Sequence, residues 1–155
     1  MKKKNDQDRA IAVNRRARHL YVILEQLECG IALQGTEVKS LRQGKCSLAE
    51  AYGQFKKGEL YLVGANIGEY ENASYGSHKP VRDRKLLLHA RELKKWIKAT
   101  SEKGMTMVPL QVYLKDHLIK VEMGLVRGKK LFDKRAQDKE RESKREIDRA
   151  MRRSR

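Results

Sequence analysis

The stretch that decides the fold is residues 110–123, which read LQVYLKDHLIKVEM. Apolar and polar side chains alternate on both sides of the triplet Lys115-Asp116-His117. A period of two places the apolar residues on one face of a strand, and a short polar break between two such segments is typical of a hairpin. We therefore predict two antiparallel strands, whose apolar faces carry Leu110, Val112, Leu114, Ile119, Val121 and Met123.

The flanking sequence predicts further strands and two helices. Short apolar runs rich in Val, Ile, Leu and Tyr extend from His19 to Leu33 and from Tyr52 to Ile67, and Gly residues interrupt them, as is typical of strands. A short helix is predicted over Gly35–Gly44, because Gly favours helix ends. The clearest helix is Ala90–Lys103, since one face at helical spacing collects Leu93, Trp96, Ile97 and Thr100.

These elements indicate a mainly β fold with short helices, and more specifically a small antiparallel barrel of the OB type. About five or six short strands with one clear helix suit such a barrel. Pro109 lacks an amide proton, which restricts its strand to an edge or places Pro109 at the beginning of the strand. We divide the chain into a flexible N-terminal arm (residues 1–13), an OB-fold-like barrel (14–132) and a basic C-terminal tail (133–155).

The charge balance predicts a polyanionic partner. The 155 residues include 36 Lys or Arg and 20 Asp or Glu, which gives a formal net charge of +16. Such a protein is attracted to nucleic acid or to an anionic membrane, and composition alone does not separate the two. No apolar run approaches the ~20 residues that span a bilayer, and Met1-Lys2-Lys3-Lys4 precedes polar residues instead of an apolar signal region. We expect a cytoplasmic protein without a membrane partner.

The C-terminal tail combines high charge with helix-forming residues. Residues 127–155 hold 13 Lys or Arg and 6 Asp or Glu. Acids precede bases at helical spacing, as in Glu140 and Lys144, which favours a helix. The segment cannot build a core, because from Asp133 onward its only apolar residues are Ala136, Ile147, Ala150 and Met151. We predict a disordered or conditionally helical tail that orders when RNA neutralises its charge; a merely solubilising tail is the alternative.

Several chemistries lack the residues that they need. Cys29 and Cys46 form neither a CxxC pair nor a disulfide framework, and the four His residues are scattered, so we expect no metal site and no cofactor. No two Gly residues are adjacent, two apart or three apart, which excludes a GxGxxG fingerprint and a GXXG clamp. The segment beginning at Gly44 is not the end of a Walker A loop, since Lys39 and Cys46 occupy the required Gly and Ser/Thr positions.

RNA recognition is the chemistry that the remaining residues favour. Guanidinium and ammonium groups bind phosphates, and flat side chains stack on exposed bases. Tyr21, Tyr75 and Phe132 offer stacking surfaces. The basic residues form four clusters, namely Asn14-Arg15-Arg16-Ala17-Arg18, then Lys39, Arg42 and Lys45, then Arg82, Arg84 and Lys85, and finally Arg127, Lys129, Lys130, Lys134 and Arg135.

Four segments in collinear order resemble one known family. They are GIALQGTEVKSLR at residues 30–42, RKLLLH at 84–89, LVRGKK at 125–130 and DKR at 133–135. They resemble the SsrA-binding protein family, also called small protein B (SmpB). The resemblance implies an OB-fold barrel that binds the tRNA-like domain of transfer-messenger RNA and takes it to stalled ribosomes for trans-translation. It implies a binding protein, not an enzyme.

The resemblance also implies roles for individual residues of the barrel. Glu37 would orient an arginine or accept a hydrogen bond from a base or ribose, and the alternative is a carboxylate that stabilises the start of a helix. Residues 14–16 match the family's Asn-basic-basic motif. The basic residues among 82–85 match those that precede the family's Leu-Leu-Leu segment. The expected RNA-binding residues are Asn14, Arg15, Arg16, Glu37, Lys39, Arg42, Lys45, Arg82, Arg84 and Lys85.

In the tail, the resemblance implies contacts with the ribosome. The tail would become helical in the empty mRNA channel and stand in for the codon and anticodon at the decoding centre. Phe132 keeps a stacking role against small-subunit rRNA, and Ile147 and Met151 are candidate apolar anchors. Elongation factor Tu is a further expected partner. The tail residues expected to act there are Gly128, Lys129, Lys130, Phe132, Asp133, Lys134, Arg135, Ile147 and Met151.

Two other functions compete with this interpretation. A general OB-fold RNA-binding factor, such as a translation or cold-shock-like protein, would tolerate many RNA sequences. An RNA-modifying or RNA-hydrolysing enzyme could use Glu37 and His89 as an acid/base pair, and its turnover would disappear in Glu37→Gln. We expect no turnover.

Overall fold

The alternating stretch at residues 110–123 lies in a long antiparallel hairpin, as its period of two predicts. The hairpin joins β8 (Met105–Lys115) to β9 (Leu118–Gly128), and its turn residues Asp116 and His117 adopt φ values of 48° and 65°. Positive φ at both central residues matches the right-handed twist of paired strands. Val112, Val121 and Met123 of the predicted faces are buried in the main core. Leu110 is buried in a second cluster with Ala17, Val108 and Val126, because the register shifts between Pro109 and Gln111, so its predicted place on the same face as Val112 is wrong.

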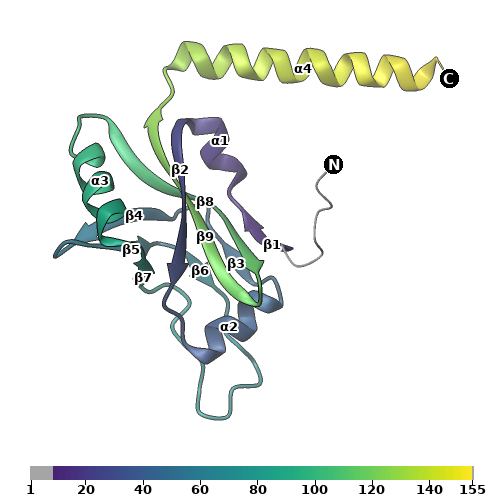
Figure 1. Cartoon of the computed structure of the whole chain (residues 1–155). Helices are drawn as coiled ribbons and strands as arrows, with labels where there is room; N and C mark the ends of the chain where they lie inside the picture. Colours follow the sequence, from purple (N-terminus) through teal and green to yellow (C-terminus); the bar gives the residue numbers. More distant parts are fainter. Residues whose placement is uncertain (1–8, 155) are drawn as a thin grey trace.

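The structure, a computed structural model, describes residues 9–154, except for the side chains of residues 131–133 (Figure 1). Besides the hairpin, this range contains seven strands and four helices. The strands are β1 (Arg9–Val13), β2 (Tyr21–Ile31), β3 (Cys46–Ser47), β4 (Tyr52–Lys56), β5 (Glu59–Val63), β6 (Asn66–Ile67) and β7 (Arg84–Leu87). The helices are α1 (Arg15–Leu20), α2 (Gly35–Arg42), α3 (Ala90–Thr100) and α4 (Leu131–Arg153).

The main sheet closes on itself, which confirms the predicted small antiparallel barrel. Its strands follow the order β1-β8-β4-β5-β7-β2-β9, and β9 also pairs with β8. Because β8 and β9 pair directly, β1 is the one described strand of this sheet that lies outside the closed ring, and β3 and β6 pair with each other in a separate two-stranded sheet. The interior is filled by side chains from strands and helices, including Leu41, Leu60, Leu62, Leu86, Met107, Val121 and Met123. Three strands have 11 residues, so they are longer than the short strands that the sequence indicated.

The N-terminal residues that the structure describes belong to the sheet. β1 pairs with β8, and Arg9 lies opposite Leu114 while Val13 lies opposite Gln111. The prediction of a flexible arm is therefore wrong for residues 9–13, because the outer side of β8 offers unpaired backbone groups that β1 satisfies. The rest of the predicted arm, residues 1–8, lies outside the described residues.

Pro109 lies inside β8, so the prediction of an edge strand or a strand beginning is wrong. On one side of β8 the partner strand changes, since Met107 pairs with Gly53 of β4 whereas Gln111 pairs with Val13 of β1. Pro109 falls between these pairs, and the register with β9 shifts between Pro109 and Gln111. A residue without an N–H is tolerated where the hydrogen-bond ladder is already interrupted.

Both predicted helices form. α3 packs against the barrel through Trp96, whose side chain is buried, while Ile97 on the predicted apolar face remains 37% exposed. α2 ends at Arg42, and Gly44 just beyond it adopts a φ of +76°, a conformation that costs Gly little. α1 was not predicted as a helix, because the sequence shows it only as a basic cluster.

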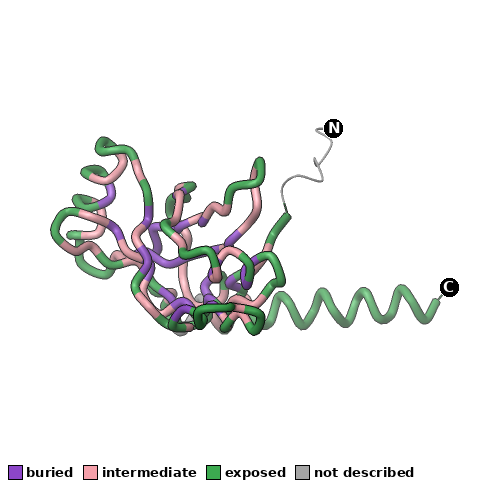
Figure 2. The backbone as a smooth tube through the Cα atoms, turned by 90° about the horizontal axis from the view of Figure 1, so that it is seen from below, coloured by how far each residue is buried: buried purple, intermediate pink, exposed green. Residues whose placement is uncertain are grey.

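The C-terminal tail is a single long helix that projects from one end of the barrel. α4 begins at Leu131, two residues before the predicted start of the tail, and points away from the body of the protein (Figure 1). Every residue from 138 to 154 is exposed (Figure 2). Among residues 9–154, no helix is both long and apolar enough to cross a membrane.

Candidate nucleic-acid interface

The first predicted cluster is built around Asn14, which precedes α1. Its Oδ1 accepts a hydrogen bond from the Ala17 backbone N–H at 3.1 Å, so Asn14 caps the helix. Its Nδ2 donates to the carbonyls of Pro109 at 2.9 Å and Leu48 at 3.2 Å. The side chain is therefore buried and fully engaged. The cap presents Arg15 and Arg16 to solvent on the first turn of α1.

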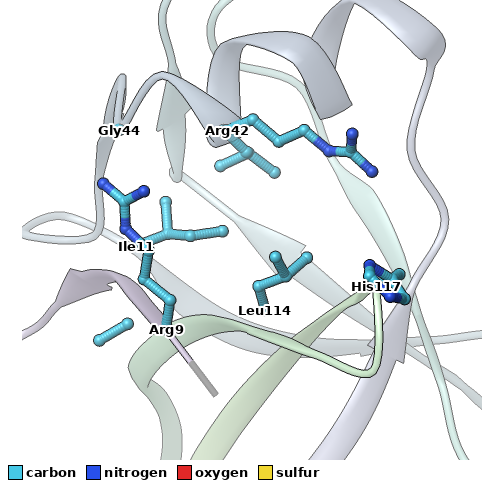
Figure 3. Close-up of a pocket in the computed structure, with 8 residues that line it drawn as sticks. Arg9, Ile11, Arg42, Gly44, Leu114 and His117 are labelled. Carbon is cyan, nitrogen blue, oxygen red and sulfur yellow. The ribbon is translucent and has the colours of Figure 1, made fainter. Parts of the chain in front are cut away.

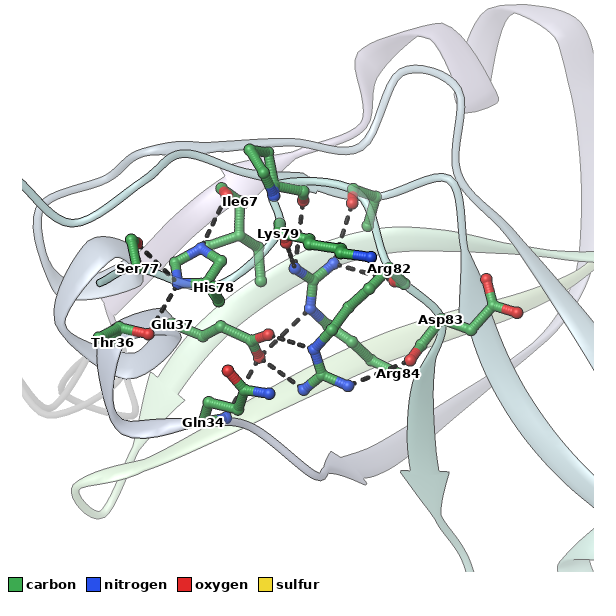
Figure 4. A network of polar contacts seen from close by, with 12 residues as sticks. Gln34, Thr36, Glu37, Ile67, Ser77, His78, Lys79, Arg82, Asp83 and Arg84 are labelled. Carbon is green, nitrogen blue, oxygen red and sulfur yellow. Dashed lines mark hydrogen bonds and ion pairs between the residues drawn. The ribbon is translucent and has the colours of Figure 1, made fainter. Parts of the chain in front are cut away.

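The second cluster is a buried carboxylate between two guanidinium groups (Figure 4). Glu37 of α2 is 0% exposed, and its carboxylate accepts hydrogen bonds from Nε of Arg82 and, at 3.0 Å, from Nη2 of Arg82. Nε of Arg84 lies 3.3 Å from Oε2 of Glu37. The Gln34 backbone N–H also donates to Oε2 at 3.3 Å. In this geometry Glu37 holds two arginines from the first turn of α2.

The charges of this network fix the ionisation of Glu37. Burial by itself raises the pKa of a carboxyl group. In Glu37 the hydrogen bond from Arg82 and the charge of Arg84 outweigh burial, so the pKa lies below its ordinary value. Burial lowers the pKa of Arg84, and the neighbouring Glu37 carboxylate opposes this shift. Glu37 is therefore an anion that holds Arg82 in place.

Arg84 organises the loop between β6 and β7 from inside. Its guanidinium group donates to the carbonyl of Ala65 at 2.9 Å and to that of Pro80 at 3.1 Å. Its side chain is 0% exposed, which contradicts the predicted direct contact of Arg84 with RNA. His78 fixes the same loop, because Nε2 lies 2.9 Å from the carbonyl oxygen of Ile67. Arg84 therefore has a structural role, although it belongs to a basic segment of the sequence.

The remaining basic residues of the predicted barrel site reach the surface. Arg42 is exposed, and the ammonium group of Lys39 lies 5.2 Å from the centre of the Tyr70 ring. Lys45 lies 3.7 Å from a carboxylate oxygen of Glu71. Lys85 of β7 pairs with Glu59, and this hydrogen bond raises the pKa of Lys85. Arg82 keeps 29% of its side chain exposed.

The structure places these groups at two ends of the barrel. Figure 1 shows α1 beside the beginning of α4, whereas α2 and the loop that leads to β7 lie at the opposite end. The residues around Glu37 are joined by the contacts described above. Asn14, Arg15 and Arg16 are not part of that group, and they lie next to the tail instead.

The beginning of the tail is fixed to α1 by Lys129. Its backbone N–H donates to the carbonyl of Leu20 at 3.0 Å, and its Nζ donates to the carbonyl of Arg18 at 2.9 Å. Nζ also donates to Oε1 of Gln137 on α4. In addition, Nδ1 of His19 lies 3.5 Å from Oδ1 of Asp138.

The other predicted tail residues are spread along α4 and the strand before it. Gly128 ends β9, Lys130 precedes α4, and Arg135 is exposed while Lys134 is half-buried. Ile147 and Met151 are 55% and 63% exposed. Phe132 and Asp133 lie on the helical backbone, and their side chains fall outside the described residues.

Sequence reasoning missed an exposed acidic residue among basic ones. Glu28 of β2 accepts hydrogen bonds from the Tyr113 hydroxyl and, at 3.2 Å, from Nζ of Lys115. The bond from Tyr113 is the main reason why the pKa of Glu28 lies below its ordinary value. Glu28 lines a cavity of about 540 Å³, together with residues that include Glu92 and Lys120. The period-two alternation, which places Tyr113 and Lys115 on the same face of their strand, was the one sequence signal for this contact.

The thiols and aromatic residues offer little other chemistry. Cys29 and Cys46 are free, and burial raises their pKa values to about 12 and about 11, which disfavours the reactive thiolate. Within residues 9–154, no group of three or more His, Cys, Asp or Glu side chains is placed to hold a metal ion. Tyr75 is fully exposed, whereas Tyr21 is half-buried against α1.

Comparisons with known proteins agree on one family. The SmpB protein family model matches residues 11–153. The SsrA-binding protein of Acetivibrio thermocellus is 48% identical, with 94% of this chain and 95% of that protein covered. The SsrA-binding protein of Bifidobacterium adolescentis is 52% identical, with 92% and 90% covered.

A solved structure described as "tmRNA-SmpB: a journey to the center of the bacterial ribosome" matches with a TM-score of 0.64. It is 50% identical, and the match covers 77% of this chain and 85% of that chain. The sequence match spans the barrel and α4 alike. The chain therefore belongs to the SmpB family.

Proposed function

We propose that this protein binds the tRNA-like domain of transfer-messenger RNA and delivers it to stalled ribosomes for trans-translation. The proposal rests on one observation, which is that this chain of the SmpB family consists of two separate basic parts. One is a closed barrel with surface cations that internal contacts hold in place, and the other is a 23-residue helix that projects into solvent. Two separate parts suit two partners, an RNA and the ribosome.

The barrel is the part that recognises the RNA. Its phosphate-contacting groups are the exposed or half-exposed cations, since these can reach a ligand without unfolding. Glu37 and Arg84 act from inside by positioning Arg82 and the loop before β7, and Asn14 acts by capping α1. The contacting residues that we assign are Arg15, Arg16, Lys39, Arg42, Lys45, Arg82 and Lys85.

The tail acts on the ribosome. A helix with exposed charges along its length has too few apolar residues to pack against the barrel. It can instead become ordered in a channel that rRNA phosphates line. We assign Gly128, Lys129 and Lys130 to the positioning of α4, and Lys134 and Arg135 to rRNA contacts near the decoding centre. Phe132 stacks on a small-subunit rRNA base beside Asp133, and Ile147 and Met151 anchor the far half of the helix in the mRNA channel.

The protein acts by binding and not by catalysis. Glu37 is buried as an anion beneath two arginines, and a general base of lowered pKa in such a position is poorly suited to proton abstraction. His89 is exposed at the start of α3, where its backbone N–H donates to Glu92. We place the protein in the cytoplasm, and we propose elongation factor Tu as a partner that binds the same charged RNA.

The test measures dissociation constants for transfer-messenger RNA and for an ordinary tRNA in a salt series. It compares the full chain with a version that ends at Leu131. We expect transfer-messenger RNA to bind more tightly at high salt, because shape-specific contacts survive screening better than purely electrostatic ones. We also expect the shortened protein to keep this preference and to lose tagging on stalled ribosomes.

The opposite result would identify a general RNA-binding protein. If both RNAs bind alike at every salt concentration, and if the shortened protein binds neither, the tail is a nonspecific polycation and the assignment to ribosome rescue fails. A matched control is Lys139→Gln on the exposed face of α4. This variant removes one tail charge, and it should leave the preference between the two RNAs unchanged.

A further inference from the structure

A cavity lies between β1, the end of α2 and the turn that joins β8 to β9 (Figure 3). Its volume is about 290 Å³. Figure 3 shows the guanidinium groups of Arg9 and Arg42 on opposite sides of an apolar floor. The cavity combines three nitrogen-bearing side chains with three apolar ones, namely Arg9, Arg42 and His117 with Ile11, Leu41 and Leu114.

The chain brings these groups together from three distant segments. β1 carries Arg9 and Ile11, and it is held in place by its pairing with β8. The positive φ values of Asp116 and His117 make the tight turn that carries His117 to the rim. Leu41 is buried at the end of α2, and Arg42 follows it at the surface. The cavity is therefore part of the folded barrel and not a gap in a loop.

The two arginines of the cavity have no acidic partner in the part of the chain that the structure describes. Among residues 9–154, neither Arg9 nor Arg42 forms an ion pair with a carboxylate, whereas Arg16, Arg82 and Arg84 each do. None of the described residues that line the cavity is acidic. Two unpaired guanidinium groups beside apolar surface suit a ligand that has an anionic end and a flat apolar body.

We propose that this cavity binds a single 5′-phosphorylated nucleotide. The base lies on the floor of Ile11, Leu41 and Leu114, the phosphate binds Arg42 on one side of this floor, and Arg9 faces the nucleotide from the other side. A volume close to the lower limit of ligand pockets, about 300 Å³, suits one nucleotide and excludes a duplex. A phosphate alone would not need the apolar floor, and an apolar ligand would not need the cations.

Such a nucleotide can come from two sources. It is either an unpaired nucleotide of a bound RNA, whose base leaves its stack, or a free mononucleotide. The first source rests on the proposed RNA-binding function, and the second is independent of it. The chemistry of the site is the same for both.

The first arm of the test titrates the full-length ¹⁵N-labelled protein with adenosine 5′-monophosphate, adenosine or inorganic phosphate. We expect the monophosphate to shift the amide signals of Ile11, Gly44 and His117. It should bind at least about tenfold more tightly than either fragment, and Arg42→Gln should weaken it about tenfold, as expected for one charge-assisted hydrogen bond. Arg91→Gln, an exposed substitution on α3, is the matched control and should change nothing.

The proposal is overturned if the monophosphate binds no better than phosphate, or if Arg42→Gln and Arg91→Gln behave alike. The second arm identifies the source by measuring transfer-messenger RNA affinity with and without the monophosphate. Competition, together with a specific loss in Arg42→Gln, assigns the cavity to an RNA nucleotide. Nucleotide binding without competition assigns it to a free mononucleotide. Failure of the proposed function is a separate result, because it appears as equal affinity of the wild type for transfer-messenger RNA and tRNA.

Discussion

Individual polar residues in this protein act mainly by fixing the positions of others. Asn14 holds α1, Glu37 holds Arg82, and Arg84 holds the loop before β7. A motif that marks an RNA-binding family therefore contains two kinds of residue. Some contact the ligand, and others make the contacting groups rigid, which lowers the entropy lost on binding.

Asn14→Ala and Arg15→Ala should separate these two kinds of residue. Asn14→Ala removes a helix cap and leaves two buried carbonyls without their donor, so we expect the free energy of unfolding to fall by about 2 kcal/mol or more. Arg15→Ala should leave stability within about 0.5 kcal/mol and weaken RNA binding instead. Urea unfolding and RNA affinity, measured on both variants, check this. Equal stability of the two variants would contradict a structural role for Asn14.

Glu37 should make the stability of the protein depend on pH in acid. Because its pKa in the folded state lies below that of the unfolded chain, the unfolded state binds the proton more readily, and stability rises with pH. The contribution is complete above the unfolded value of about 4.3, and it is lost as pH falls through the lowered folded-state pKa.

The variant Glu37→Gln should remove this part of the pH dependence. At neutral pH it should cost about 3 kcal/mol or more, because Arg84 keeps a buried charge without its anion. Urea unfolding between pH 3 and pH 7 measures both effects. Glu140→Gln, at an exposed position on α4, serves as the control. A Glu37→Gln curve parallel to the wild-type curve across this range would be inconsistent with the network.

Among the elements, α4 owes its direction to its first turns. Lys129 contacts the end of α1 and the side chain of Gln137, and most of the helix beyond touches nothing else in the described chain. Lys129→Met should therefore leave α4 helical but allow it to move independently of the barrel. ¹⁵N relaxation should show a shorter rotational correlation time for α4 than for the barrel, while Lys139→Met should not. Identical correlation times in Lys129→Met and the wild type would rule out this role.

The helices and strands that could be predicted are those whose periodicity is visible within a short stretch of sequence. The hairpin at residues 110–123 and the helix around Trp96 follow from periodicity alone. The burial of Arg84 does not, because it depends on Glu37, which is distant in sequence and meets Arg84 only in the closed barrel. For the same reason, the sequence shows Arg9 as part of a polar arm, although pairing with β8 makes it part of the sheet.

For the whole molecule, the arrangement of charge at two ends predicts how RNA binding depends on salt. If one RNA reaches both ends, Arg15→Gln and Lys39→Gln should each reduce the slope of log affinity against log salt by about one. The double variant should show the sum, since distant sites act independently. Arg91→Gln on α3 is the control, and fluorescence anisotropy in a salt series is the measurement. If only one variant changes the slope, a single end contacts the RNA.

The closure of the barrel has a consequence for how the chain folds. The ring is completed when β9 pairs with both β2 and β8, and Tyr21 then lies opposite Gly128. A contact between such distant residues forms slowly, because the intervening chain must first lose much of its conformational freedom. During synthesis, the backbone groups of β2 that pair with β9 stay unpaired until nearly the whole barrel sequence has been made. A chain interrupted before Leu118 would keep these groups unpaired and would be prone to aggregate.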